Sequence, residues 1–168
     1  MKALITEKHQ SGVVTKFGEW EDDALGDGDV LVRVEYSALN YKDALALTGR
    51  GGIMQHYPLI GGIDLAGIVE TSDSALFKTG DRVLANGWGL SQTHNGGFAE
   101  RARVPAEWLI PVPDALSTRD AMAIGTAGYT AMLCVLALER SGLTPGSGNI
   151  LVSGANGGVG SIAIALLS

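Results

Sequence analysis

A glycine-rich turn near the end of the sequence has the residue types and spacing that bind a diphosphate. The apolar segment 150–153 precedes this turn, and the helix-forming segment 161–167 follows it. In the nucleotide fingerprint G-x-G-x-x-G, glycines let a diphosphate approach the backbone and rest on the amides that open the next helix. Gly157 and Gly160 occupy the second and third glycine positions, and Ala155 replaces the first. The candidate cofactor-binding residues are Gly154, Ala155, Asn156, Gly157, Gly158, Val159 and Gly160.

The flanking segments favour a nucleotide site over a plain strand-to-helix connection, which the glycine spacing alone also fits. A buried strand at 150–153 and a helix start at 161 are the elements that the fingerprint requires. The residue that reads the ribose lies about 20 residues beyond the turn, past Ser168, so NAD and NADP both stay open. A single parallel strand and one helix leave their apolar faces uncovered. We therefore expect this chain to be the front part of a longer protein.

Three polar residues in the first half of the sequence are candidates for the reacting end of a site. Tyr41 opens a predicted helix at 41–47, where its phenol can donate a hydrogen bond to a nicotinamide amide or a substrate carbonyl. The alternative is that the Tyr41 ring packs against a sheet and has no ligand. Asn40 can bind substrate or cap the same helix. Asp64 lies in an apolar strand, so its carboxylate needs donors, such as the amides of 61–62, or a shifted pKa; its role is structural or catalytic.

Four further residues have simpler interpretations. Asp43 and its neighbour Lys42 are expected to form a solvated pair on the predicted helix, with a structural role for Asp43 slightly favoured. His94 lies in the loop SQTHNGG and is expected to be solvated. Cys134, the only cysteine, stands among apolar residues and is predicted to be a buried thiol.

Short strands separated by glycine turns dominate the first two thirds of the sequence. Val30, Val32, Val34 and Tyr36 alternate with other residues, which predicts a strand over 29–39 with one buried face. Further strands are expected at 62–70, 80–86, 96–104 and 107–113. The 24 glycines have no fixed period and indicate the tight turns of a β barrel. From Ser117, which resembles a helix N-cap, the pattern changes to a helix over 121–140 that is broken near 125–128.

Composition excludes several classes of protein. The net charge of −6, with no run of four basic residues, argues against a nucleic acid partner. One cysteine excludes a disulfide framework and fits a reducing compartment, so the expected location is the cytoplasm. The apolar runs are shorter than the roughly 18 residues of a membrane helix, and no membrane association is expected. One cysteine and three scattered histidines provide no ligand set for zinc.

Several segments together resemble one family along the whole chain. They are ALNYKDALALTGRG, PLIGGIDLAGIVE, KTGDRVLANGWG, GGFAERARV, AIGTAGYTAML and VSGANGGVGSIAIALL. In this order and spacing they are similar to the zinc-independent medium-chain dehydrogenases/reductases. The nearest branch is the quinone oxidoreductase YhdH/YhfP type, which includes acryloyl-CoA reductases.

The resemblance implies a mixed α/β protein of two domains with the active cleft between them. A GroES-like β barrel would occupy 1–118, and 119–168 would be the truncated start of a Rossmann domain. Members of the family are about twice as long, so the chain resembles their N-terminal half, and its activity by itself stays open. In the zinc-dependent relatives, cysteine and histidine ligands fall where this chain has Asn40 and Ile63. No metal site is therefore expected.

The activity that the resemblance implies is hydride transfer from NADPH to an activated carbon–carbon double bond, as in acryloyl-CoA. A quinone substrate is the alternative, and a non-catalytic truncated product or assembly module is an alternative of another class. The family places Tyr41 against the cofactor, with Asn40 and Asp64 as further catalytic candidates. Thr126 would approach the nicotinamide, and Thr130 either joins it or bonds back to its own helix. A homodimer is expected.

Overall fold

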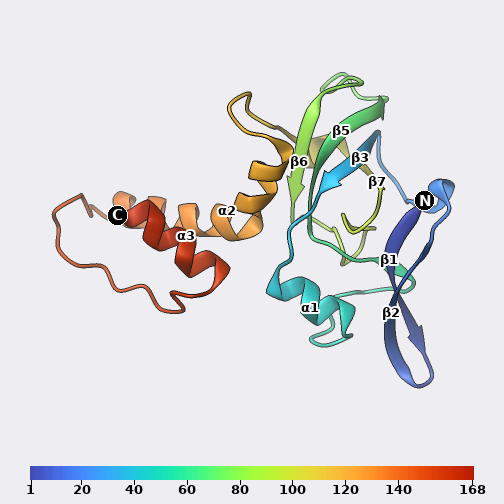
Figure 1. Ribbon diagram of the computed structural model, residues 1–168, viewed down its shortest axis with the longest axis horizontal. Coiled ribbons are helices and arrows are strands. Elements are labelled where there is room, and N and C mark those ends of the chain that lie inside the picture. Colours follow the sequence, from blue (N-terminus) through green and yellow to red (C-terminus); the bar gives the residue numbers. More distant parts are fainter. The chain divides into compact units, whose positions relative to one another are not determined.

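Eight strands of the computed structural model, which describes residues 1–168, form two antiparallel sheets (Figure 1). The smaller sheet has the order β2-β1-β4 and consists of β1 (Lys2–His9), β2 (Gly12–Glu19) and β4 (Leu59–Ile60). The larger sheet has the order β7-β3-β5-β6-β8 and consists of β3 (Val30–Tyr36), β5 (Asp64–Ser72), β6 (Arg82–Asn86), β7 (Arg101–Val104) and β8 (Ile110–Pro111).

The alternation that predicted a strand over 29–39 is confirmed by β3. Val30 and Val32 are fully buried and pack in the main apolar core with Leu65 of β5. The strands expected at 62–70 and 80–86 are present as β5 and β6, and β7 is the end of the segment 96–104. Within 107–113 only β8 is a strand, because prolines at 111 and 113 lack the N–H that extends a ladder. A 3-10 turn, η2 (Ala106–Trp108), precedes it.

Backbone hydrogen bonds between β1 and the segment before β7 join the two sheets into one barrel. The Leu4 N–H donates to the Phe98 carbonyl at 2.8 Å, and the Glu100 N–H donates to the Lys2 carbonyl at 3.1 Å. A second 3-10 turn, η1 (Asp22–Ala24), lies between β2 and β3. The short helix α1 (Tyr41–Leu47) has the predicted bounds and is followed by Gly49 at φ 68. That conformation suits glycine, which commonly ends helices.

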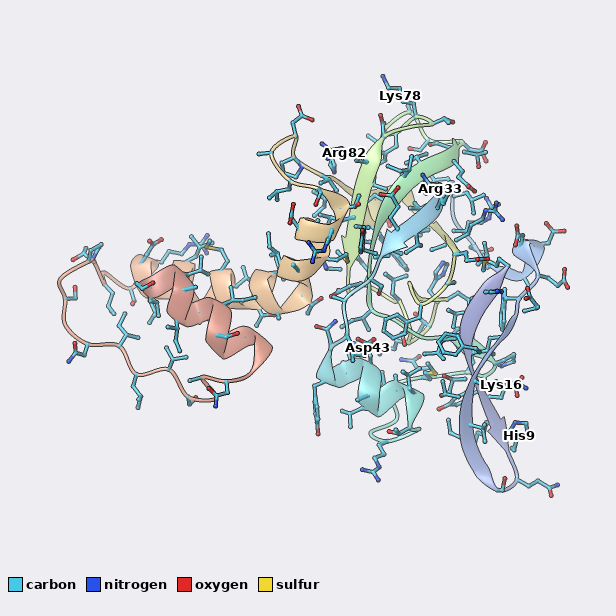
Figure 2. All side chains as sticks on the ribbon, in the orientation of Figure 1. His9, Lys16, Arg33, Asp43, Lys78 and Arg82 are labelled. Carbon is cyan, nitrogen blue, oxygen red and sulfur yellow. The ribbon has the colours of Figure 1, made fainter.

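The long helix α2 (Thr118–Arg140) changes direction at Gly125, whose φ of 50 and ψ of −162 are not helical. The predicted cap is present: the Asp120 N–H donates to the Ser117 hydroxyl at 3.1 Å, and the Ser117 N–H donates back to the Asp120 carboxylate at 3.1 Å. In Figure 2, Arg82 reaches from β6 toward the segment before the helix, where it donates to the Leu116 carbonyl at 2.6 Å. The predicted break near 125–128 is confirmed.

The chain divides into two compact units, Met1–Ala123 and Ile124–Ser168, and the domain boundary expected after 118 stays a prediction. The first turn of α2 belongs to the barrel unit because Ala121 and Met122 pack in an apolar cluster with Ala66 of β5.

By length and mean hydropathy (1.8), α2 is apolar enough to span a membrane, a property that the shorter apolar runs did not indicate. Only 28% of that apolar window is buried, and the helix is broken at Gly125.

In the second unit, the part of α2 after Gly125 packs against α3 (Gly158–Leu167). A Cβ on Gly158 would lie 3.2 Å from Ala127, and one on Gly128 would lie 3.5 Å from Ile162.

The strand predicted at 150–153 is wrong, since this segment has no strand partner and Leu151 is 95% exposed. The prediction of a buried Cys134 is also wrong: it is exposed at an open apolar hollow of about 510 Å³. Burial of both would require further strands beside them.

Candidate functional site

Two fully buried carboxylates lie at the start of α1 and of β5, and Asn40 connects them. The backbone N–H of Asn40 donates to Asp43 at 2.7 Å, while its side-chain amide donates to Asp64 at 2.9 Å. Asn40 is also the N-cap residue of α1. The structure therefore brings together Asn40, Tyr41 and Asp64, the three residues that the sequence proposed for the reacting end.

Asp43 lies at the end of α1 that faces the strands (Figure 2). Besides Asn40, the Ile63 N–H donates to its carboxylate at 2.9 Å. Burial raises the pKa of Asp43, the hydrogen bonds from Asn40 and Ile63 oppose this shift, and the charge of Asp64 adds to it. The predicted solvated pair with Lys42 is wrong, because the Lys42 ammonium donates instead to the Gln92 side chain at 3.2 Å. Asp43 thus holds the start of α1 against β5.

The Asp64 carboxylate accepts hydrogen bonds from two side-chain amides, which come from two different parts of the chain. Asn40 binds one of its oxygens, and Asn86, its cross-strand neighbour on β6, donates to the other at 3.0 Å. The Gly61 N–H, which the sequence offered as a donor, binds the Leu4 carbonyl. Because Asp64 is fully buried, its geometry favours positioning Asn40 over touching a substrate. Asn86 was not predicted as a site residue, although a polar residue at the end of an apolar strand is a usable signal.

Tyr41 is the exposed member of this group. Its side chain is 81% exposed, and its hydroxyl makes no hydrogen bond within the chain. The carboxylates and amides behind it instead fix the backbone from which it projects. An unpaired phenol on a rigid helix start can donate to a ligand carbonyl.

The loop 87–95 that follows β6 carries unusual backbone strain. Trp88 (φ 51) and Ser91 (φ 61) are the only non-glycine residues of the chain with positive φ, a conformation that costs roughly 1–2 kcal/mol for each. The Trp88 ring stacks on Trp108, with centroids 5.9 Å apart and planes at 4°. His94, expected to be solvated, is half-buried, with its ring edge on Trp108 and its Nε2 donating to the Arg103 carbonyl at 2.7 Å. This expectation for His94 is wrong.

In the glycine turn of the second unit, packing and backbone conformation explain two glycines but do not explain a third. Gly154 has φ 64, and a Cβ on Gly160 would come within 2.3 Å of the Gly154 carbonyl oxygen, so the fold requires both glycines. A Cβ on Gly157, in contrast, would meet only the Gly154 oxygen, at 3.3 Å. Gly157 caps α3 without a side-chain bond, and the first amides of a helix have no partner within it. The turn fits a diphosphate at these amides.

The two threonines proposed for the cofactor lie on α2, after its break. The Thr130 hydroxyl donates to the Thr126 carbonyl at 2.7 Å, the bond back to its own helix that the sequence allowed as an alternative. This bond leaves the oxygen of Thr130 able to accept a further hydrogen bond. A cofactor role for either threonine stays a prediction.

At the position of the zinc ligands in the zinc-dependent relatives, this chain has a different chemistry. Asn40 has its amide on Asp64, and Ile63 is an apolar, buried side chain. No group of three or more His, Cys, Asp or Glu side chains converges in the structure. The donor set present here suits hydrogen bonding.

A GroES-like β barrel joined to the opening turn of a nucleotide-binding fold is the class of protein that these features define. Residues 26–114 match the family model of the alcohol dehydrogenase GroES-like domain. The chain belongs to this family.

The relatives confirm the resemblance to the YhdH/YhfP branch. The chain is 51% identical over 167 residues to the probable acrylyl-CoA reductase AcuI of Escherichia coli, covering 99% of this chain and 52% of that protein. It is 45% identical to the putative quinone oxidoreductase YhfP of Bacillus subtilis, covering 99% and 51%. The crystal structure of the YhdH oxidoreductase of Salmonella enterica with NADP matches with a TM-score of 0.97 and 53% identity, covering 99% and 52%. The chain spans about half the length of these relatives.

Proposed function

We propose that this chain forms the barrel and the phosphate-binding turn of an NADPH-dependent reductase, which reduces the activated double bond of an enoyl thioester such as acryloyl-CoA. The observation that carries the proposal is the 51% identity to a probable acrylyl-CoA reductase across nearly the whole chain. The exposed Tyr41 on a rigid support and the open position at Gly157 supply the matching chemistry.

In this proposal the turn from Gly154 to Gly160 holds the diphosphate, and Thr126 and Thr130 line the nicotinamide end. NADPH bound there would supply the hydride for the β-carbon of the enoyl thioester, and the α-carbon would take a proton from solvent, so that the thioester stays intact. Tyr41 donates a hydrogen bond to the thioester carbonyl and so stabilises the negative charge that develops there. Asn40 orients the substrate, and Asp64 holds the Asn40 amide in place.

The test measures NADPH oxidation at 340 nm with acryloyl-CoA. Two proteins are compared: the chain of 168 residues, and a fusion of this chain to the remaining half of the Escherichia coli relative. We expect saturable oxidation by the fusion. Absence of activity in a folded fusion that still binds NADPH would overturn the reductase proposal and favour the non-catalytic alternative.

A quinone substrate is the second candidate, because the chain is also 45% identical to a putative quinone oxidoreductase over 99% of its length. The same assay with a small quinone in place of acryloyl-CoA separates the two. The substrate with the higher kcat/KM identifies the activity.

Tyr41→Phe tests the proposed hydrogen bond to the carbonyl. Loss of one donor to a developing oxyanion is expected to lower kcat of the fusion by about 100-fold. Folding is expected to be unaffected, because the ring is 81% exposed and its hydroxyl has no partner in the chain. Tyr36→Phe, at a 45% exposed tyrosine on β3, is the matched control. Equal rates for Tyr41→Phe and the control would assign Tyr41 to packing alone.

We also propose that the protein is a cytoplasmic homodimer. β2 is an edge strand of the smaller sheet, and its Phe17 is 85% exposed. An open edge with an exposed aromatic side chain can pair with a second copy. Sedimentation velocity of the chain and of Phe17→Ser measures whether this edge forms the dimer.

A further inference from the structure

The strained loop 87–95 sets an aromatic side chain where the backbone would favour glycine. Trp88 has φ 51 and stands between Gly87 and Gly89, yet it carries the largest side chain available. Strain of this kind persists when the surrounding structure enforces it, and it concentrates at functional sites. The same loop contains Ser91, whose hydroxyl is the only buried side-chain polar atom of the chain without a hydrogen-bond partner. We propose that Trp88 is a stacking platform that binds a flat aromatic ring of the substrate.

One face of the Trp88 ring is available. The other face rests on Trp108, with the planes only 4° apart. Although it is stacked on Trp108, Trp88 is 60% exposed, so much of its surface is open to a ligand. A ligand ring placed there would extend an existing stack, which is a favourable geometry for aromatic groups.

The platform is rigid because Trp108 is held from several sides. The His94 ring contacts Trp108 edge-on, with centroids 5.2 Å apart, and the His94 Nε2 is bonded to the Arg103 carbonyl. Trp108 also packs against the main apolar core of the barrel. A Cβ on Gly89 would lie 3.2 Å from the Trp108 ring, so the loop backbone is in close contact with it. A rigid aromatic surface loses little conformational freedom when a ligand binds.

The loop is attached to the elements that carry Asn40 and Tyr41. At its start, the Gly87 N–H donates to the Ile63 carbonyl at 2.7 Å, and the preceding Asn86 binds Asp64. Further along, Gln92 accepts the hydrogen bond from Lys42, the residue that follows Tyr41 in α1. Trp88 and the candidate reacting end therefore belong to one connected framework of the barrel unit.

The ligand chemistry is a flat ring that stacks through its π face. Adenine of a coenzyme A thioester and the ring of a quinone share this chemistry, and stacking of this type tolerates different rings. The choice between these two rings rests on the proposed function. The binding of a ring to Trp88 does not itself depend on turnover of the substrate.

The experiment follows the indole N–H signals of the 15N-labelled chain by NMR. The chain has three tryptophans, and Trp20, whose Nε1 donates to the Ala24 carbonyl at 3.0 Å, is an internal reference in another apolar cluster. Adenosine 3′,5′-bisphosphate and duroquinone are titrated separately. We expect one or both to shift the Trp88 and Trp108 signals saturably while the Trp20 signal stays in place. A response to the first alone assigns adenine, and a response to the second alone assigns the quinone ring.

Trp88→Gly tests the platform without damaging the loop. Glycine adopts the positive φ freely, so this variant is expected to fold, with the dispersed amide spectrum of the parent. Its affinity, followed at the Trp108 signal, is expected to fall about tenfold or more. Trp20→Phe is the matched control and is expected to bind as the parent does. The proposal is overturned if neither ligand shifts Trp88, if Trp20 shifts equally, or if Trp88→Gly binds with unchanged affinity. None of these readouts requires NADPH, so their failure is distinct from a failure of the reductase assay.

Discussion

The barrel unit and the unit that follows it are built from similarly apolar sequence, yet only the barrel encloses a core. In Met1–Ala123, large side chains such as Leu65, Val83 and Leu90 are fully buried. In Ile124–Ser168 the buried hydrophobic residues are Ala131 and Ala163 alone, while Leu151 is 95% exposed. Antiparallel strands close a barrel within one stretch of chain, whereas a buried parallel strand needs neighbours on both sides. Hydrophobic content therefore does not by itself produce a core.

Removal of a large core side chain should separate the two units most clearly. Leu65→Ala removes a fully buried side chain from the main apolar cluster and is expected to lower the free energy of unfolding by about 2–5 kcal/mol. Leu151→Ala makes the same chemical change at a 95% exposed position and should stay within about 0.5 kcal/mol. Urea denaturation followed by far-UV circular dichroism measures both units, because each contains helix. Equal effects of the two changes would contradict the comparison.

The buried carboxylate of Asp43 tests the polar part of the barrel interior. Asp43→Asn places an NH2 group against one of two N–H donors, and we expect a loss of about 1–3 kcal/mol. Burial raises the pKa of Asp43 above its ordinary value of 3.8, so the native state binds more protons than the unfolded state just above that pH. The stability of the parent should fall as pH rises through this window.

Because asparagine does not titrate, the stability gap between the parent and Asp43→Asn should narrow as pH rises from 3.8. Urea denaturation at several pH values measures this gap. A gap that widens with pH would mean that the hydrogen bonds from Asn40 and Ile63 outweigh burial and lower the pKa instead.

A smaller effect is expected at the start of α2. Ser117→Ala removes the cap that binds the Asp120 N–H and should cost about 1 kcal/mol, measured by urea denaturation. Ser161→Ala, at an exposed serine in the first turn of α3, is the control and should change stability by less than about 0.5 kcal/mol. If the control loses as much, the first turn of α3 contributes more to stability than its exposure indicates.

Local signals predicted the elements that depend on few residues. The bounds of α1 follow from Asn40 at its start and Gly49 after its end, and the break in α2 follows from a glycine in an otherwise helical pattern. The segment 150–153 has the composition of a buried strand but forms none, because strand formation depends on partners outside the segment. Its prediction failed for this tertiary reason.

Asn40, Tyr41 and Asp64 stay candidates for the site, because the structure brings them together but does not test their roles. Their hydrogen bonds were not predicted, since the donor from Asn86 depends on the register that sets Asp64 opposite Asn86. That register joins segments more than twenty residues apart, which a local pattern does not specify. The backbone strain at Trp88 is likewise a property of the folded loop. The sequence does not predict it, because no residue type in the loop indicates that a tryptophan will adopt a positive φ.

Two hydrogen bonds from Asn40 make three positions depend on one another. Its main-chain N–H donates to Asp43 and its side-chain amide donates to Asp64, so replacing either acid also removes one hydrogen bond of the asparagine. Mutational effects at these positions should then combine non-additively. An evolving lineage could exchange one of the three at low cost only after another had already changed, which makes this trio a natural source of epistasis.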